Sequence, residues 1–302
     1  MNALGKTILK DVSRSFYLSM RLLPSEMREP ISLAYLLARA SDTLADTETL
    51  DAELRYEMLE GFSEIIHGGD SKLWLDRLSS EVTPKQKHEG EKRLMENMHG
   101  IFSWLASIKG AATYAAIITV MDHILRGQKL DIERFELRDD FQFTHDDELE
   151  EYCYLVAGCV GEFWTEIGFL TLDGFAYEDR AKMHSWGADY GKGLQLINIL
   201  RDLPSDLENG RCYLPNVDAG NKEAIMKASE RWRARARDYL QSGATYADAL
   251  VHRRTRIATA LPSIIGERTL DLLDQADWKT LQAGVKISRK QVYRAAWDAF
   301  LR

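Results

Sequence analysis

Two aspartate pairs have the spacing of a divalent-cation site. Asp42 and Asp46 (DTLAD), and Asp202 and Asp206 (DLPSD), are each four residues apart. On a helix this spacing places both carboxylates on one face, about 5–6 Å apart at their β-carbons. Such like charges repel unless a cation lies between them, and magnesium is bound by one or two carboxylates together with substrate phosphates. Two pairs that faced each other would therefore hold several ions and a diphosphate.

Polar residues one or two turns upstream extend each pair into a stripe. Gln195 and Asn198 precede the second pair, and Arg39 precedes the first. One such pair alone is usually a solvated helix face, but two pairs with an arginine or amides in register favour a binding site. Pro204 lies inside the second pair and lacks a backbone donor, which predicts a kink or a new first turn and a displaced Asp206.

The elements that must position these residues are helices. Apolar residues recur at spacings of three and four, the helical period, and no strand-like alternation is longer than a few residues. Loops are expected near 68–69, 139–140, 172–174 and 209–210, and no linker divides the chain. The sequence predicts one all-α domain over residues 1–302, with helices after Pro30 and at 50–66, 91–125, 147–171, 178–203, 221–243 and 266–283.

Composition narrows the class of protein. The chain has 302 residues, 39 basic and 47 acidic, and its net charge of −8 argues against nonspecific binding to nucleic acid. The three cysteines, none in a CxxC motif, suit a reducing compartment. We see no secretory signal, and the apolar run 115–121 is far shorter than the ~20 residues of a membrane span. These features predict a cytoplasmic protein that is at most peripheral at the inner membrane face.

Four segments together resemble one family, the squalene and phytoene synthases, which join prenyl diphosphates head to head. The likeness extends over roughly residues 8–270, and the last two segments are its most specific part. The segments are 12–16 (VSRSF), 35–46 (YLLARASDTLAD), 152–161 (YCYLVAGCVG) and 195–215 (QLINILRDLPSDLENGRCYLP).

The resemblance implies an isoprenoid synthase fold, with helices around a central cavity, and an enzyme that is a prenyltransferase. Two farnesyl diphosphates would condense through a cyclopropyl intermediate, presqualene diphosphate, most plausibly to squalene. The motif SDTLAD is nearer to the ALDTLED type of squalene synthases than to the ADDIVD type of phytoene and dehydrosqualene synthases. Dehydrosqualene, hydroxysqualene, presqualene and phytoene formation remain the alternatives. Magnesium is implied throughout, and NADPH if the product is squalene.

The resemblance also assigns roles residue by residue. Asp42, Asp46, Asp202 and Asp206 match metal-binding aspartates, of which we count Asp42 and Asp202 as catalytic, and Tyr152 matches the tyrosine assigned proton transfer. Gly158 and Gly161 would leave room for an isoprenoid chain or a closely packed helix. Substrate-binding positions are Ser13, Arg14, Ser15, Phe16, Tyr35, Arg39, Gln195, Asn198, Arg201 and Arg211.

Three other patterns in the sequence also have plainer interpretations. The alternate arginines of 231–237 (RWRARAR) would spread around a solvated helix, although a helical nucleic-acid or partner-binding protein could use them. Gly191-Lys192-Gly193 is too isolated to indicate an NADPH site. The basic segment 279–302, interspersed with aromatics, is either a packed terminal helix or a peripheral membrane contact. The oligomeric state is left open.

Overall fold

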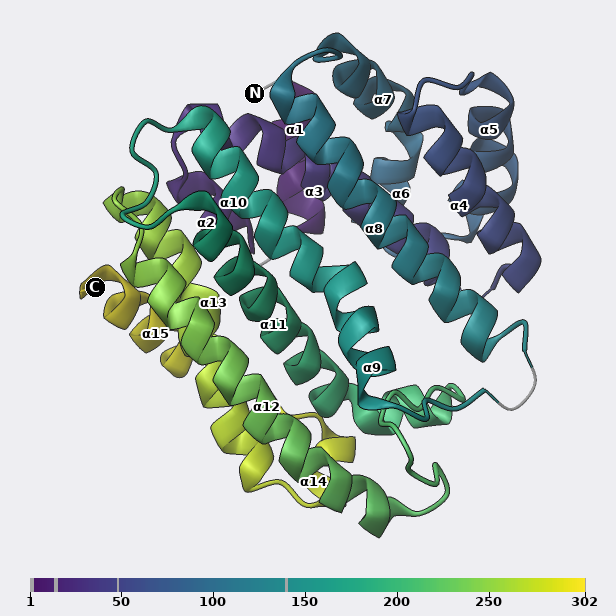
Figure 1. Ribbon diagram of the computed structural model, residues 1–302. Coiled ribbons are helices and arrows are strands. Elements are labelled where there is room, and N and C mark those ends of the chain that lie inside the picture. The colour runs from purple at the N-terminus through teal and green to yellow at the C-terminus, as the bar shows by residue number, and fades with distance from the viewer. Residues whose placement is uncertain (1–2, 14–15, 48, 139–140, 302) are drawn as a thin grey trace. The chain divides into compact units, whose positions relative to one another are not determined.

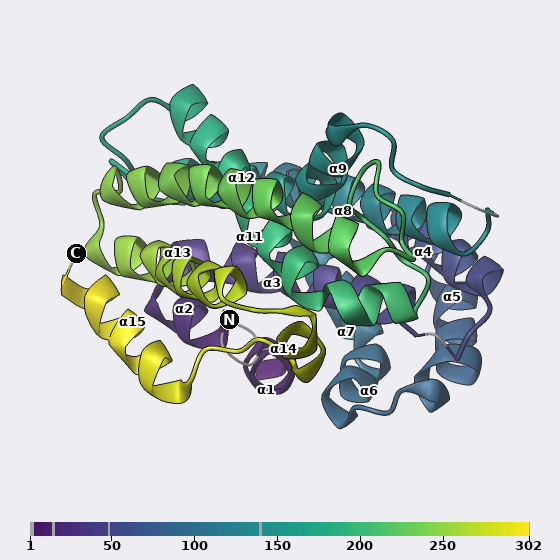
Figure 2. The ribbon, with the colours of Figure 1, turned by 90° about the horizontal axis from the view of Figure 1, so that it is seen from below.

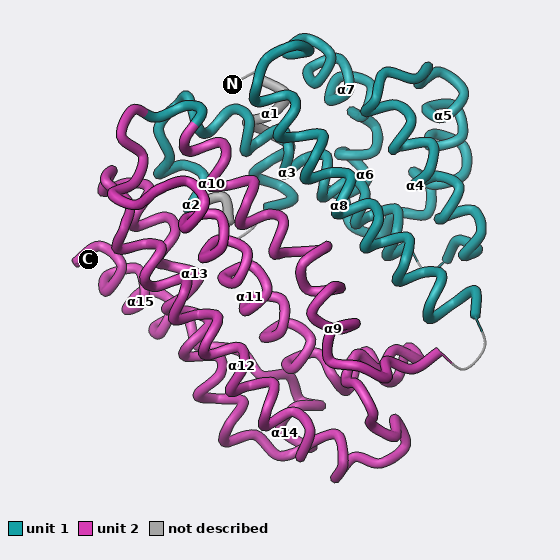
Figure 3. Tube along the Cα trace, in the orientation of Figure 1, with its two compact units in different colours: residues 1–139, 170–172 teal, residues 140–169, 173–302 magenta. Residues whose placement is uncertain are grey.

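The computed structural model describes residues 3–13, 16–47, 49–138 and 141–301. Within these ranges the chain is mainly helical and contains no β-strand, only an isolated antiparallel bridge between Ala176 and Leu250 (Figure 1). The all-α prediction is confirmed. The chain packs into two compact units, residues 1–139 with 170–172 and residues 140–169 with 173–302 (Figure 3). A single domain over 1–302 stays a prediction.

In the first unit, helix α3 (Ser25–Ala45) lies at the centre. It packs against six other helices of the unit, and 13 of its 21 residues are buried. Phe62, Trp74 and Phe102 form an edge-to-face aromatic cluster beside it, with ring centroids 5.3–5.7 Å apart. The other elements are α1 (Ala3–Val12), α2 (Phe16–Leu22), α4 (Ala52–Ile66), α5 (Lys72–Arg77), the π turn η1 (Leu78–Val82), the 3-10 turn η2 (Thr83–Lys85), α6 (Glu89–Glu96), α7 (Met98–Ser107) and α8 (Ala112–Phe135).

In the second unit, helix α11 (Arg180–Glu208) has the same central position. It contacts α9, η3, α12, α13 and α14, and Figure 2 shows α12 and α13 running beside it. The central helix of each unit is thus the one that carries an aspartate pair. The surrounding elements are α9 (Asp146–Cys153), the π turn η3 (Tyr154–Gly158), α10 (Cys159–Thr171), α12 (Lys222–Asp248), α13 (Arg253–Asp274), α14 (Trp278–Ala283) and α15 (Arg289–Leu301).

The predicted helix boundaries are partly right. The helices at 50–66, 178–203 and 221–243 are confirmed within a few residues, except that α11 and α12 each continue five residues further. The single helix at 91–125 is wrong, because breaks at Asn97 and 108–111 divide it into α6, α7 and α8. The helix at 266–283 is also wrong: α13 ends at Asp274, and Asp277 caps α14 by accepting a hydrogen bond from the Thr280 amide. The loop at 139–140 lies outside the described residues.

Backbone contact between α10 and α11 explains the glycines of the segment VAGCVG. A methyl group on Gly161 would lie 1.8 Å from the carbonyl oxygen of Gly187, and one on Gly191 would lie 2.1 Å from that of Ala157. Of the two uses expected for Gly158 and Gly161, the structure shows the close helix. A methyl group on Gly193 would lie 2.8 Å from Tyr239 Cβ of α12, so the glycines of the Gly-Lys-Gly sequence serve the packing of other elements against α11.

The π turn η3 changes which side chains share a face. An α-helix through 152–160 would place Tyr152, Val156, Cys159 and Val160 together, but a π turn holds more residues per turn and shifts the register. Tyr152 and Cys159 are accordingly buried, whereas Val160 is exposed. These four residues therefore do not share one apolar face.

We predict that Gly161→Ala lowers the free energy of unfolding by about 2–3 kcal/mol, because the added methyl group must push two packed backbones apart. Urea denaturation followed by far-UV circular dichroism measures the change. Gly220→Ala is the control, since Gly220 is exposed and its added methyl would meet only the Asp218 side chain at 3.3 Å. Equal stability of the Gly161 and Gly220 variants would contradict the close contact.

Candidate functional site

Helix α3 exposes one narrow polar face. From Pro30 to Asp46 every residue is buried except five that fall at helical spacing on one face: Tyr35, Ala38, Arg39, Asp42 and Asp46. A helix buried on all other sides keeps such a face only where it borders water or a ligand. The Tyr35 hydroxyl donates to the Val12 carbonyl at 3.2 Å. Four of the predicted site residues are thus brought together in the first unit.

The first aspartate pair lies where the backbone already carries negative charge. Asp46 caps the C-terminal end of α3 and donates its amide N–H to the Asp42 carbonyl at 2.8 Å. The C-terminal end of a helix has a partial negative charge, so two carboxylates there are unfavourable. Burial and the charge of Asp46 together raise the pKa of Asp42 from 3.8 to about 7, although Arg39 and a hydrogen bond from Gln128 oppose the shift.

Gln128 is a site residue that sequence reasoning missed. It lies on α8, is 8% exposed, and donates from Nε2 to Asp42 Oδ1 at 2.6 Å. Its Oε1 is buried and has no hydrogen-bond partner among the described residues. Gln128 is 86 positions from Asp42 and belongs to no motif, so only the packing of α8 on α3 reveals it.

Arg39 is occupied by a carboxylate rather than by the aspartate pair. Its Nη2 forms an ion pair with Glu91 of α6, and its Nε is buried without a partner in the described part of the chain. Both side chains of the pair are partly exposed, so the interaction is worth little net energy. The guanidinium can therefore leave Glu91 for a phosphate at small cost.

The polar stripe on α11 is present as predicted. Between Gln195 and Asp206 the apolar residues are buried, and those with solvent exposure are Gln195, Asn198, Arg201, Asp202, Ser205 and Asp206. Asn198 Nδ2 donates to Gln195 Oε1 at 3.4 Å. Arg201 contacts both carboxylate oxygens of the adjacent Asp202, at 2.9 and 2.5 Å.

Pro204 does not interrupt α11. The helix continues to Glu208, and Pro204 is buried within it. We predicted a kink or a new first turn at Pro204. Of these two, the new first turn is wrong, and Asp206 stays on the accessible face. The Asp206 carbonyl accepts the Arg211 amide at 2.7 Å, which folds the chain back after the helix and keeps Arg211 next to the motif. The second pair thus also lies near the C-terminal end of its helix.

Tyr152 is paired with a second tyrosine that the motif analysis did not single out. Its ring stacks on Tyr213 with centroids 4.9 Å apart and an interplanar angle of 22°, and the two hydroxyls are 3.5 Å apart. Both rings are buried. Burial raises the pKa of the Cys212 thiol, and so does the charge of the Asp206 carboxylate. Cys212 immediately precedes Tyr213, so the tyrosine pair is one residue away from a group that senses the second aspartate pair. The signal for Tyr213 was its place in the segment GRCYLP.

The N-terminal motif is only partly described. Ser13 is buried and its hydroxyl donates to the Leu9 carbonyl, so it caps α1 locally. Arg14 and Ser15 lie outside the described residues, and of Phe16 only its place at the start of α2 is described. Their substrate contacts stay predictions.

The arginines of 231–237 are all neutralised by acids on neighbouring helices. Two of them, Arg231 and Arg235, pair with Asp146 and Glu150 of α9. The other two, Arg233 and Arg237, pair with acids at the end of α13, chiefly Asp274. The alternation joins α12 to a helix on each side, which leaves no free row of guanidiniums for a nucleic acid.

A network of polar side chains centred on Lys192, next to these ion pairs, connects α9 to α11. Lys192 Nζ contacts Glu150 at 3.2 Å, Asp189 at 3.1 Å and the Tyr239 hydroxyl at 3.0 Å. Lys192 is thus engaged with side chains and does not form a phosphate loop with its flanking glycines. The Gly-Lys-Gly sequence accordingly does not fit a dinucleotide site.

The donor set of the two stripes fits a hard divalent cation. Among the described residues no three His, Cys, Asp or Glu side chains form a ready-made metal cluster. Each stripe instead offers two carboxylates, and magnesium usually takes only one or two of these and completes its shell with water and phosphate. Burial, and after it the repulsion from Asp46, raises the pKa of Asp42, and a cation beside the pair would relieve both effects.

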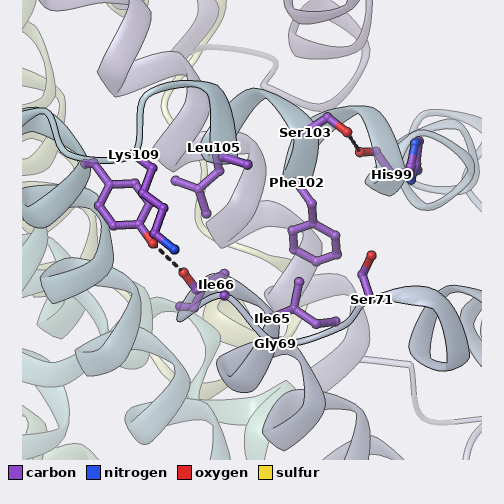
Figure 4. Close-up of a pocket in the computed structure, with 12 residues that line it drawn as sticks. Ile65, Ile66, Gly69, Ser71, His99, Phe102, Ser103, Leu105 and Lys109 are labelled. Carbon is purple, nitrogen blue, oxygen red and sulfur yellow. Dashed lines mark hydrogen bonds between the residues drawn. The ribbon is translucent and has the colours of Figure 1, made fainter.

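A surface pocket in the first unit is separate from these residues (Figure 4). It has a volume of about 300 Å³, with an apolar floor that includes Ile65, Phe102 and Leu105 and a rim that includes His99 and Lys109. None of the predicted site residues lines it. The pocket shows no convergence of polar groups, so it gives no support to a second site.

One described stretch, 146–171, is long and apolar enough to cross a membrane, with a mean hydropathy of 1.2. A single such stretch is weak evidence, because the core helix of a water-soluble protein has the same character. Here the stretch contains the glycines that pack on α11, which accounts for its composition. The absence of a membrane span stays a prediction.

Comparison with known proteins gives a consistent likeness. The family model "Squalene/phytoene synthase" matches residues 9–291. The chain is 30% identical over 222 residues to squalene synthase of Gibberella zeae, covering 73% of this chain and 43% of that protein. It is 27% identical over 215 residues to the bifunctional lycopene cyclase/phytoene synthase of Blakeslea trispora, covering 69% and 31%. The chain thus spans less than half the length of these relatives.

A solved structure shares the fold. The complex of TcSQS with the ligand BPH1237 superposes with a TM-score of 0.78 at 20% identity, covering 98% of this chain and 85% of that one. The fold of this chain is therefore the all-helical isoprenoid synthase fold, as the motifs predicted.

Because the pKa of Asp42 is raised, we predict that ionisation of this carboxyl group lowers the stability of the folded protein. Because its folded-state pKa is about 7 and its usual value 3.8, the folded protein binds the extra proton between these pH values, and stability falls as pH rises through them. We expect Asp42→Asn, without added metal, to raise the free energy of unfolding at pH 8 by at least about 1 kcal/mol. The gain should vanish near pH 4. Thermal melts at both pH values measure it, with Asp238→Asn, at an exposed position on α12, as the control; no gain at pH 8 would contradict the electrostatic strain.

Proposed function

The chain belongs to the squalene/phytoene synthase family, and we propose that it condenses two farnesyl diphosphates head to head, through presqualene diphosphate, to squalene. The observation that supports this most directly is the pair of acidic stripes. Each occupies the accessible face of the central helix of a compact unit and ends at the negative end of that helix. Carboxylates in this position are unfavourable unless cations and a diphosphate compensate them.

Magnesium would be held by Asp42 and Asp46 on α3 and by Asp202 and Asp206 on α11. When bound, it supplies positive charge that stabilises the leaving diphosphate. Both stripes offer carboxylate oxygens as ligands. Their oxygen-only donor set suits magnesium better than a softer metal.

Two arginines are suited to exchange partners during binding. Arg201 lies along Asp202 through two hydrogen bonds, and Arg39 is held by Glu91. Once Asp202 is engaged by a cation, the fork of Arg201 becomes available for phosphate oxygens, which it matches in geometry. We propose the same transfer for Arg39. Gln195, Asn198 and Arg211 would supply the remaining polar contacts to substrate.

Tyr152 would act on the organic part of the substrate. Loss of diphosphate leaves an allylic cation, and ring closure to the cyclopropane releases a proton. As its phenolate, Tyr152 can accept that proton and become the neutral phenol, and the Tyr213 hydroxyl, 3.5 Å away, would stabilise the phenolate by donating a hydrogen bond to it. The two aromatic faces also favour a nearby carbocation and exclude water.

The relatives include both squalene and phytoene synthases, which form different products. The SDTLAD motif favours squalene, whose formation needs a hydride donor, and we propose NADPH for this role. Because Gly191 and Gly193 serve helix packing, we assign no residue to NADPH. Dehydrosqualene, hydroxysqualene, presqualene or phytoene formation is the alternative.

We propose a cytoplasmic location for the reaction.

Product analysis tests the reaction. Purified protein with farnesyl diphosphate and magnesium should form presqualene diphosphate, and squalene only when NADPH is added. We expect Asp202→Ala to lower turnover by at least about 10³-fold while the far-UV spectrum is unchanged, because the leaving group loses its cation. The matched control is Asp238→Ala, on the outer surface of α12. Near-normal turnover of Asp202→Ala at saturating substrate would refute the metal role, and consumption of geranylgeranyl diphosphate alone would move the product to phytoene.

The tyrosine pair allows a matched test of proton transfer. We expect Tyr152→Phe to lower formation of presqualene diphosphate by about 10²-fold or more, the usual effect of losing a general base. Tyr213→Phe keeps the same stacked ring and should cost about tenfold or less, because it only stabilises its neighbour's charge. Single-turnover chromatography of both variants measures this. Accumulation of presqualene diphosphate in Tyr152→Phe would instead place Tyr152 in the second half-reaction.

A further inference from the structure

Helix α15 has its large side chains on the outside. Tyr293, Trp297, Phe300 and Leu301 are 75%, 61%, 47% and 67% exposed, whereas the small residues Ala295 and Ala299 are buried against the rest of the unit. These four are half of the strongly exposed large hydrophobic residues in the described chain. Soluble proteins bury such residues unless the surface binds something. We call these four residues the aromatic strip.

Polar contacts from α13 hold the helix in this orientation. Arg268 donates to the Gln291 carbonyl and pairs with Asp298 at 2.5 Å. Arg253 donates to the Phe300 carbonyl at 3.1 Å and lies 4.3 Å from the Phe300 ring centroid. The inward side of α15 is thus specified by two arginines, so the outward aromatic strip is not an accident of a loosely placed terminus.

Unpaired basic side chains flank the aromatic strip. Lys286, Arg289, Lys290 and Arg294 are all exposed, and none has an ion pair with the residues that the structure describes. The one acid of the helix, Asp298, is turned inward to Arg268. On α12, by contrast, all four arginines of 231–237 are neutralised by neighbouring acids. The protein is acidic overall, so free cations concentrated on one helix need a separate reason.

We propose that α15 binds the surface of an anionic lipid bilayer and lies in the plane of the interface. Tyrosine and tryptophan have an apolar ring and a polar tip, which suits the boundary between lipid head groups and acyl chains. Each basic residue close to an anionic membrane strengthens binding by roughly fivefold, so four of them contribute substantially. The absence of an acid on the outward face gives charge complementarity to lipid phosphates. This inference does not depend on the proposed reaction.

Vesicle flotation with the full chain tests the proposal. We expect little binding to neutral phosphatidylcholine vesicles and strong binding when about 30 mol% phosphatidylglycerol is included, with loss of binding near 0.5 M salt because the charges are screened. Tyr293→Ala with Trp297→Ala, and separately Arg289→Glu with Lys290→Glu, should each lower the partition coefficient at least about tenfold.

Matched controls separate this surface from general charge and hydrophobicity. Lys85→Glu with Lys87→Glu makes the same change in net charge on exposed lysines of the first unit, and Tyr177→Ala removes an aromatic that is 74% exposed outside α15. Both should bind vesicles like the parent chain, and all variants should keep the parent melting temperature within a few degrees.

Three results would overturn the proposal. The first is absence of binding to anionic vesicles by the parent chain. The second is an equal loss of binding in the α15 variants and the controls. The third is self-association in sedimentation experiments that Trp297→Ala abolishes while vesicles bind neither form, which would assign the aromatic strip to a second copy of this chain. None of these measurements uses substrate, so failure here is distinct from failure of the proposed reaction.

Discussion

The second unit depends on two helices whose backbones touch. Gly161 and Gly187, and Ala157 and Gly191, approach so closely that no side chain fits between them. The segment on one side carries Tyr152, and α11 on the other carries the amide and aspartate stripe. Because backbone meets backbone, their separation does not depend on the rotamers of intervening side chains. Precise placement of reactive groups needs rigid support of this kind.

Electrostatic strain is concentrated at the ends of the two central helices. A sequence selected for stability alone would place cations near a helix C-terminus, yet both α3 and α11 end in paired carboxylates. Arg201 and Gln128 offset part of the cost in the second and first unit respectively. Both helices thus break the same local rule, the preference for cations near a helix C-terminus. A violation that occurs twice in this way is typical of functional sites, where stability is given up for binding.

The sequence was most informative where periodicity and chemistry coincide. The stripe from Gln195 to Asp206 could be predicted because helical spacing alone aligns its members, and Pro204 misled only because a buried proline can be accommodated near a helix end. Gln128 could not be found, since its contact with Asp42 joins helices far apart in the chain. The breaks within 91–125 were also hidden, because apolar spacing continues in phase across short turns. The π turn at 154–158 lies against α11, and no local pattern in the sequence indicated it.

Helix α15 has its large side chains outside and its small ones inside, and this also affects how the chain unfolds locally. Its inner face offers only small side chains: Ala299 packs in a cluster with Ala247 and Ala260, and two guanidinium groups of α13 bond to the helix. A helix that buries only small side chains opens locally at a lower free energy than a helix buried on every side. Its amide hydrogens should therefore exchange with solvent long before those of α11. Helix α15 would then unfold and reorient as a separate cooperative element, while the glycine contacts between α10 and α11 stay intact.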